Sequence, residues 1–296
     1  MDYGRPVEFG YFPEPAVAGV PRLFDEVALA ERVGLDLVGI QDHPYQWRYL
    51  DTFTLLANLA ARTTRVRLFP DVANLPLRPP AMLAKAAASI DVLSGGRFEV
   101  GLGAGGFWDA IEAMGGPRRA PGEAVEAFED AIAIMRLMWS GERSVRYEGR
   151  HYRVRGVHPG PPPPHPIGIW VGASGPRMLG LIGRLADGWL PSSPYVPPGE
   201  LPGRQARIDE AAVAAGREPA AIRRAYNVSG RITARGGGFL DGPPEQWVEE
   251  LAELVLERGM DTFILWAADP VAEQLERFAG EVVPAVRDAV AAARGR

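Results

Sequence analysis

Strand and helix patterns alternate along almost all of this 296-residue chain, and this alternation limits the fold more than any other feature. Amphipathic or apolar helical patterns separate short apolar runs that have the length of buried strands. The eight runs are residues 7–12, 36–41, 66–72, 97–103, 167–172, 188–190, 226–232 and 262–266. Eight such units predict a (β/α)8 barrel, a TIM-type α/β fold with parallel strands. The alternative is a doubly wound open sheet, which more often has fewer strands.

Two stretches interrupt the alternation of strands and helices. Residues 144–166 contain an alternating pattern around Glu148-Gly149, which predicts a β-hairpin before the fifth strand. Residues 191–224 contain a proline-rich loop and then a polar helix after the sixth strand. We expect both as insertions on one barrel domain that spans residues 1–296.

Composition excludes several classes of function. The net charge is −5 and no basic block is present, so nucleic-acid binding is not expected. No cysteine is present, which excludes disulfides, thiolate zinc sites and cysteine nucleophiles. The histidines at 151, 158 and 165 lack metal-ligand spacing, so we expect no metal. The first six residues do not resemble a signal peptide, and no apolar run reaches the ~18 residues of a membrane span. A cytoplasmic protein without membrane partners is expected.

Glycines follow the fourth predicted strand in the spacing G-x-G-x-x-G, at Gly101, Gly103 and Gly106. This spacing is typical of a Rossmann dinucleotide site, in which it opens the first βα unit. Here several strand–helix units precede it, and the acids about 20 residues later, Glu123 and Glu126, lie in a helical pattern. The pattern therefore favours a strand-end loop of a barrel, and an NAD(P) enzyme is a distant alternative.

The carboxyl ends of the strands select the candidate site, because barrel ligands bind there. His43 is the only histidine that follows a strand, with Asp42 beside it and Trp47 four residues later. A polar group next to a flat apolar side chain suits acid–base chemistry beside a planar ligand. A lone histidine is more often structural, and that alternative stays open here.

Another strand end runs directly into a helix, through residues 172–177. The N–H groups of that helix, the Ser174 hydroxyl and Arg177 suit a phosphate. Ser174 as a simple helix cap is an equally good interpretation of the local sequence. The chain has no nucleophile elbow and no Walker loop, so we expect a bound organic cofactor to carry the chemistry.

Three motifs carry a resemblance to a known family: the pair Asp42-His43, residues 93–97 before the glycine-rich loop, and residues 172–175 leading to residues 186–189. On these motifs the chain resembles the luciferase-like flavin-dependent oxidoreductases over nearly its whole length. It is most similar to the branch that uses the deazaflavin coenzyme F420.

The resemblance implies positions for the cofactor and the reacting groups. In the family, a bulge after the third strand holds a non-prolyl cis peptide against the ring, here expected at Asp71-Val72. His43 corresponds to the active-site histidine of F420-dependent sugar-phosphate dehydrogenases, Trp47 to a tryptophan of the pocket, and Asp42 is the polar partner. The residues expected to bind cofactor are Asp71, Val72, Ala73, Asn74, Ala104, Gly105, Gly106, Ala173, Ser174, Gly175 and Met178.

One departure from the family concerns the catalytic acid. The related dehydrogenases carry a glutamate in the loop after the fourth strand, where this chain has Gly106. Asp109 is the first candidate to replace it, and Glu112 is the second. Arg78 and Lys85 are candidates to approach the anionic tail of the cofactor, or they are ordinary surface charges.

The resemblance predicts hydride transfer between F420 and a small organic substrate, in a protein that forms a homodimer. An FMN-dependent monooxygenase that uses reduced flavin and O₂ is the nearest alternative. A flavin-binding protein without catalysis is another.

Overall fold

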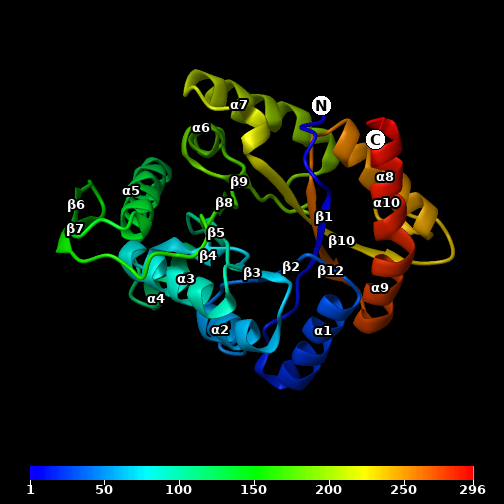
Figure 1. Ribbon diagram of the computed structural model, residues 1–296, viewed down its shortest axis with the longest axis horizontal. Helices are drawn as coiled ribbons and strands as arrows, with labels where there is room; N and C mark the ends of the chain where they lie inside the picture. The colour runs from blue at the N-terminus through cyan, green and yellow to red at the C-terminus, as the bar shows by residue number, and fades with distance from the viewer. Residues whose placement is uncertain (296) are drawn as a thin grey trace.

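The parallel strands follow one another around a single sheet (Figure 1). The computed structural model describes residues 1–295. The strands, in their order around the sheet, are β3 (Arg67–Pro70), β2 (Leu37–Ile40), β1 (Glu8–Tyr11), β12 (Thr262–Ala267), β10 (Arg223–Ile232), β9 (Gly188–Trp189), β8 (Ile169–Val171), β5 (Val100–Gly103) and β4 (Ala73–Asn74). A parallel bridge between Leu68 and Phe98 joins β3 to the residues before β5, so the two ends of the sheet meet. The predicted (β/α)8 barrel is confirmed.

Two short segments, β3 and β4, together form the third strand of the barrel. β3 pairs with β2, whereas β4 pairs with β5. Between them lie Asp71 and Val72, and the peptide bond that joins these two residues is cis, as expected. We call residues 71–74 the bulge. It lies where the third strand leaves one neighbour and joins the other, at the carboxyl end of the barrel.

Helices surround the sheet and connect successive strands (Figure 1). They are α1 (Val20–Arg32), α2 (Thr52–Arg62), α3 (Pro80–Ser94), α5 (Pro121–Trp139), α6 (Pro176–Leu185), α7 (Leu201–Ala214), α8 (Pro244–Leu256), α9 (Val271–Arg277) and α10 (Val283–Ala293). Asp51 caps α2, since its side chain accepts a hydrogen bond from the Thr54 N–H at 2.9 Å. Within residues 1–295, every helix falls short of what a membrane crossing requires.

The predicted hairpin forms a separate two-stranded sheet of β6 (Val145–Glu148) and β7 (Arg153–Val157). Asp130 of α5 anchors it by accepting hydrogen bonds from the Tyr147 hydroxyl at 2.9 Å and the His151 N–H at 2.8 Å. In the second predicted insertion, α7 connects β9 to its neighbour β10 and is therefore the crossover helix of that unit. The short helix α4 (Trp108–Ala113) after β5 was not expected.

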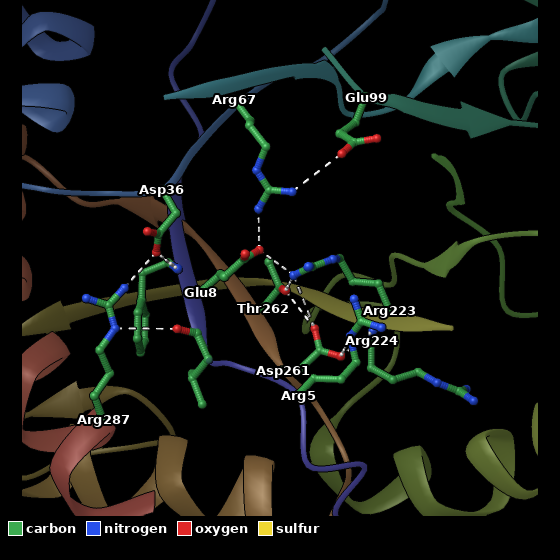
Figure 2. Close-up of polar contacts among 12 residues, drawn as sticks. Arg5, Glu8, Asp36, Arg67, Glu99, Arg223, Arg224, Asp261, Thr262 and Arg287 are labelled. Atoms are coloured by element: carbon green, nitrogen blue, oxygen red, sulfur yellow. Dashed lines mark hydrogen bonds and ion pairs between the residues drawn. The ribbon is translucent and has the colours of Figure 1, made fainter. Parts of the chain in front are cut away.

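Side chains that point into the barrel form successive levels, because alternate residues of a strand face the same side. At the amino-terminal end, the Glu8 carboxylate contacts both Arg67 and Arg223, and Arg223 also donates to the Thr262 hydroxyl at 2.6 Å (Figure 2). Above this charged level lies an apolar one, formed by Phe12, Leu37, Phe69, Trp170, Leu190, Ala225 and Ile264. These two levels close the barrel from below and leave its carboxyl end as the place for a ligand.

Candidate active site

Four of the predicted segments lie at the carboxyl end of the barrel, which we call the mouth. Three of them touch. The backbone N–H of Asn74 in the bulge donates to Asp42 after β2 at 2.8 Å. The His43 and Phe107 rings, from the loops after β2 and β5, lie 5.6 Å apart between centroids. The structure therefore brings together the segments after the second, third and fourth barrel strands.

Asp42 is a positioning residue of the bulge. Its side chain is only 3% exposed and accepts two hydrogen bonds from the Arg78 guanidinium, at 2.6 and 2.7 Å, besides the one from Asn74. Arg78 also donates to Asp51 at 2.7 Å. Among the described residues Asp42 makes no hydrogen bond with His43, and its charge acts on that ring by opposing the lowered pKa. Arg78, a candidate for the cofactor's tail, is occupied by these two carboxylates.

Replacing Asp42 with alanine should lower the free energy of unfolding by about 2–3 kcal/mol, because Arg78 would lose one of two carboxylate partners in a largely buried place. Urea unfolding followed by circular dichroism measures this change. Asp109→Ala is the matched control, and we expect it to stay within about 0.5 kcal/mol since that carboxylate is exposed. Equal losses in both variants would contradict an anchoring role for Asp42.

His43 lies half-buried against aromatic rings. Its Nδ1 atom is 2.7 Å from the Tyr45 hydroxyl oxygen, and Phe107 packs edge-on against the imidazole. Burial lowers the pKa of His43 below the ordinary histidine value, although Asp42 opposes this shift. Burial also raises the pKa of Tyr45 to about 12, so its hydroxyl stays protonated. The imidazole is therefore neutral near pH 7, with Nε2 left to exchange a proton with a ligand.

The other two predicted catalytic side chains are exposed. The Trp47 indole is 91% exposed, so it does not form a packed pocket wall in this structure. The Asp109 carboxylate is 98% exposed and pairs with Arg118, which also binds Glu112 at 2.5 Å. Both candidate acids of this loop thus belong to a surface ion-pair cluster, and this placement does not favour either as a buried catalytic acid.

The glycines of the G-x-G-x-x-G pattern have different roles. A Cβ atom on Gly101 would lie 2.2 Å from the Pro70 carbonyl oxygen, and one on Gly103 would lie 2.7 Å from the Val72 side chain. The first two glycines therefore make room for the bulge. A Cβ on Gly106 would meet nothing within 4 Å. The barrel topology excludes the Rossmann interpretation. The close approaches at Gly101 and Gly103 are the physical reason for glycine at these two positions.

Val72 is held in a cradle of glycines from two strands. Cβ atoms on Gly103, on Gly101 and on Gly172, which follows β8, would lie 2.7, 3.1 and 3.0 Å from the Val72 side chain. Ala73 is buried, and Ala104 is half-buried beside it. Gly105 has a φ of 98°, a left-handed conformation that favours glycine. These positions make the bulge a rigid part of the mouth.

The loop after β8, where an anion site is predicted, leads directly into α6. Gly175 is the N-cap of α6 without a side-chain cap, so Ser174 does not cap this helix. The Ala173 carbonyl accepts from the Trp189 indole N–H at 2.8 Å, and the Ser174 carbonyl accepts from Arg204. Met178 is buried in the first turns of α6. A groove of about 420 Å³ lies here, lined by Ser174, Pro176, Leu179, Gly199, Glu200, Gly203, Arg204 and Arg207. The two arginines of α7 were not expected in the site.

Sequence reasoning also missed a polar cluster on the floor of the mouth. Asn227 of β10 donates to Asp71 Oδ1 at 3.0 Å and to the Ser192 hydroxyl at 3.2 Å. Three buried oxygens have no hydrogen-bond partner among the described residues: Asp71 Oδ2, Asn74 Oδ1 and Asn227 Oδ1. Alternate residues of β10 face the inside of the barrel, and this alternation is the sequence signal that could have identified Asn227. Such unpaired buried oxygens fit a ligand with a polar edge.

A family model described as luciferase-like monooxygenase matches residues 7–235. An F420-dependent glucose-6-phosphate dehydrogenase of Kineococcus radiotolerans is 32% identical over 197 residues, covering 64% of this chain and 58% of that protein. The chain thus matches little more than half the length of this curated relative.

Two solved structures have the same fold. The first is an F420-dependent secondary alcohol dehydrogenase in complex with an F420-acetone adduct, with a TM-score of 0.84, 18% identity, and coverage of 96% of this chain and 100% of that chain. The second is the oxygenating constituent of 3,6-diketocamphane monooxygenase from Pseudomonas putida in complex with FMN, with a TM-score of 0.76, 20% identity, and coverage of 95% and 98%. The family model spans the strands from β1 to β10. It also includes His43, the bulge and the loop after β8. This chain belongs to the luciferase-like monooxygenase family.

Proposed function

We propose that this protein is a coenzyme F420-dependent oxidoreductase that transfers hydride between the deazaflavin and a small organic substrate. One observation carries the proposal: the bulge, cradled by glycines, leaves the buried oxygens of Asp71 and Asn74 unpaired at the same end of the barrel as His43. This floor suits a flat ring with a polar edge. The F420-dependent relatives favour a deazaflavin over a flavin.

The chain's own residues divide the work as follows. The α6 N-terminus and Arg207 would hold the phosphate of the cofactor, since N–H groups and a guanidinium group favour an anion. Arg204, which pairs with Glu200 and donates to the Ser174 carbonyl, would support this loop. The bulge would support the ring. When bound, the deazaflavin supplies a donor or acceptor of hydride. His43 would hold or accept a proton at the substrate atom that gains or loses charge, while Tyr45 and Phe107 fix the orientation of its ring.

The cofactor choice is tested by titrating the purified protein with F420 and, separately, with FMN. Fluorescence and calorimetry measure both affinities, and we expect micromolar binding of F420 and at least about tenfold weaker binding of FMN, a difference of about 1.4 kcal/mol. Micromolar binding of FMN alone would overturn the proposal. It would favour the FMN-dependent monooxygenase, which the FMN complex of the diketocamphane enzyme makes the second candidate.

A flavin-binding protein without catalysis is a third candidate, because Gly106 stands where the related dehydrogenases carry an acid and both nearby acids are exposed. A panel of alcohols, aldehydes, sugar phosphates and enones, assayed with oxidised and reduced F420, distinguishes it from an enzyme. We expect hydride exchange with at least one substrate class. Bound F420 without turnover across the panel would favour the non-catalytic alternative.

A homodimer and a cytoplasmic location are also part of the proposal, and both rest on the sequence. Light scattering coupled to gel filtration measures the mass of the particle in solution. A monomer at micromolar concentration would contradict the expected dimer.

A further inference from the structure

Asp71 differs from the other carboxylates of the mouth because it is buried without a counter-ion. The residue is 7% exposed, and its carboxyl group lies with the Phe69 ring next to Gly39. Asn227 donates to Oδ1 at 3.0 Å, and Oδ2 has no hydrogen-bond partner among the described residues. Gly39 leaves room for this carboxyl, since a Cβ on that residue would lie 3.0 Å from Oδ2. The geometry is that of a carboxyl group with one satisfied and one free oxygen.

Each element packed around Asp71 contributes a neutral group. Gly39 comes from β2, Phe69 from β3, Asn227 from β10 and Ser192 from the segment after β9. Arg78 is committed to Asp42 and Asp51, and His43 is engaged with Tyr45. The arginines at the amino-terminal end of the barrel lie beyond the apolar level. Within residues 1–295, no ion pair is formed by Asp71.

Asp42 provides the contrast within the same mouth. It is buried to a similar degree, but three hydrogen bonds, two of them from a guanidinium, satisfy its negative charge. For Asp71, burial raises the pKa to about 7, and the Asn227 hydrogen bond offsets only part of this effect. An uncompensated carboxylate is costly to bury, and covering it with a ligand removes its remaining water. The ligand proposed above is itself an anion, which adds to that cost.

We propose that Asp71 takes up a proton when the deazaflavin binds and holds it on Oδ2, the carboxyl oxygen that Asn227 leaves without a partner. This inference rests on the proposed function, because it needs F420 as the ligand. The proton comes from solvent, no bond other than the O–H bond forms, and Asn227 keeps the other oxygen of the carboxyl in place. Asp71 is thus a binding residue whose protonation is coupled to cofactor affinity.

The coupling has a definite sign. Below about pH 7 the free protein already carries the proton, so this residue adds no pH dependence to binding. Above about pH 7 the proton must be taken up from solvent, so the affinity for F420 should fall by up to tenfold for each unit of pH.

Calorimetric titration with F420 in two buffers of different ionisation enthalpy measures the protons taken up. We expect close to one proton per site at about pH 8 and close to none at about pH 6. Asp71→Asn keeps the size and a donor group, and it should bind F420 with no uptake at either pH. Asp288→Asn, at an exposed carboxylate of α10, is the matched control and should behave as the wild type.

Infrared difference spectra supply a second readout, which detects the proton on the carboxyl group directly. Binding at about pH 8 should produce the C=O band of a protonated carboxyl group, and Asp71→Asn should lack it. F420 binding without proton uptake would overturn this inference and leave the proposed function intact. Uptake that persists in Asp71→Asn would assign the proton to another group and also overturn it. Failure of F420 to bind at all would overturn the proposed function itself.

Discussion

Replacing His43 with alanine should reduce turnover at least about 100-fold while F420 affinity stays within about twofold. The imidazole is half-buried, and its Nδ1 atom lies 2.7 Å from the Tyr45 hydroxyl oxygen. Replacing it would remove the proton carrier that we propose, but would leave the bulge and the loop after β8 untouched. Steady-state kinetics with a substrate found in the panel, together with fluorescence titration of F420, measures both quantities.

The pH dependence of turnover provides a second test of His43. Because burial lowers its pKa, the neutral ring persists to a lower pH than for an exposed histidine. If His43 accepts a proton, turnover should fall as the pH drops through this lowered pKa, and that limb should vanish in His43→Ala. Tyr45→Phe is the matched control, because it removes only the hydroxyl that holds Nδ1 and should cost less. Unchanged turnover in His43→Ala would remove this residue from the mechanism.

Replacing Gly101 with alanine should lower the free energy of unfolding by about 3 kcal/mol. The new Cβ would lie 2.2 Å from the Pro70 carbonyl oxygen and 3.1 Å from a Val72 methyl group. Neither the backbone of β3 nor the bulge can move without disturbing strand pairing, so the clash cannot be relieved by a side-chain rotation. Thermal and urea unfolding measure the loss of stability, and F420 titration measures the accompanying loss of affinity.

Gly106→Ala is the control for this prediction, since it belongs to the same sequence pattern but its Cβ would meet nothing within 4 Å. We expect its stability to stay within about 0.5 kcal/mol of the wild type. Comparable losses in the two variants would contradict the role assigned to Gly101. They would indicate that an added side chain lowers stability anywhere in this glycine-rich stretch, whether or not its Cβ meets another atom.

The sequence predicted the barrel because the information for strands and helices is local. An apolar run bounded by glycine or proline marks a buried strand, and the eight runs reappear as β1, β2, β3 with β4, β5, β8, β9, β10 and β12. The cis peptide at Asp71-Val72 was expected at the right position from family resemblance. Local pattern did not reveal α4, which is short and lies in a glycine-rich loop.

Which residues face one another was decided only by the tertiary structure. Asp42 meets Arg78 and Asp71 meets Asn227 because barrel closure joins strands far apart in the chain. Exposure is decided in the same way, and it separates buried Asp71 from exposed Trp47 and Asp109 although all three follow strands. A local pattern predicts which side chains share a face of a strand or helix. It does not predict which atoms of a distant strand lie opposite them. The sequence by itself therefore determined the fold and the end of the barrel at which we propose that the ligand binds. Packing across the barrel determined which side chains at that end are buried, paired or exposed.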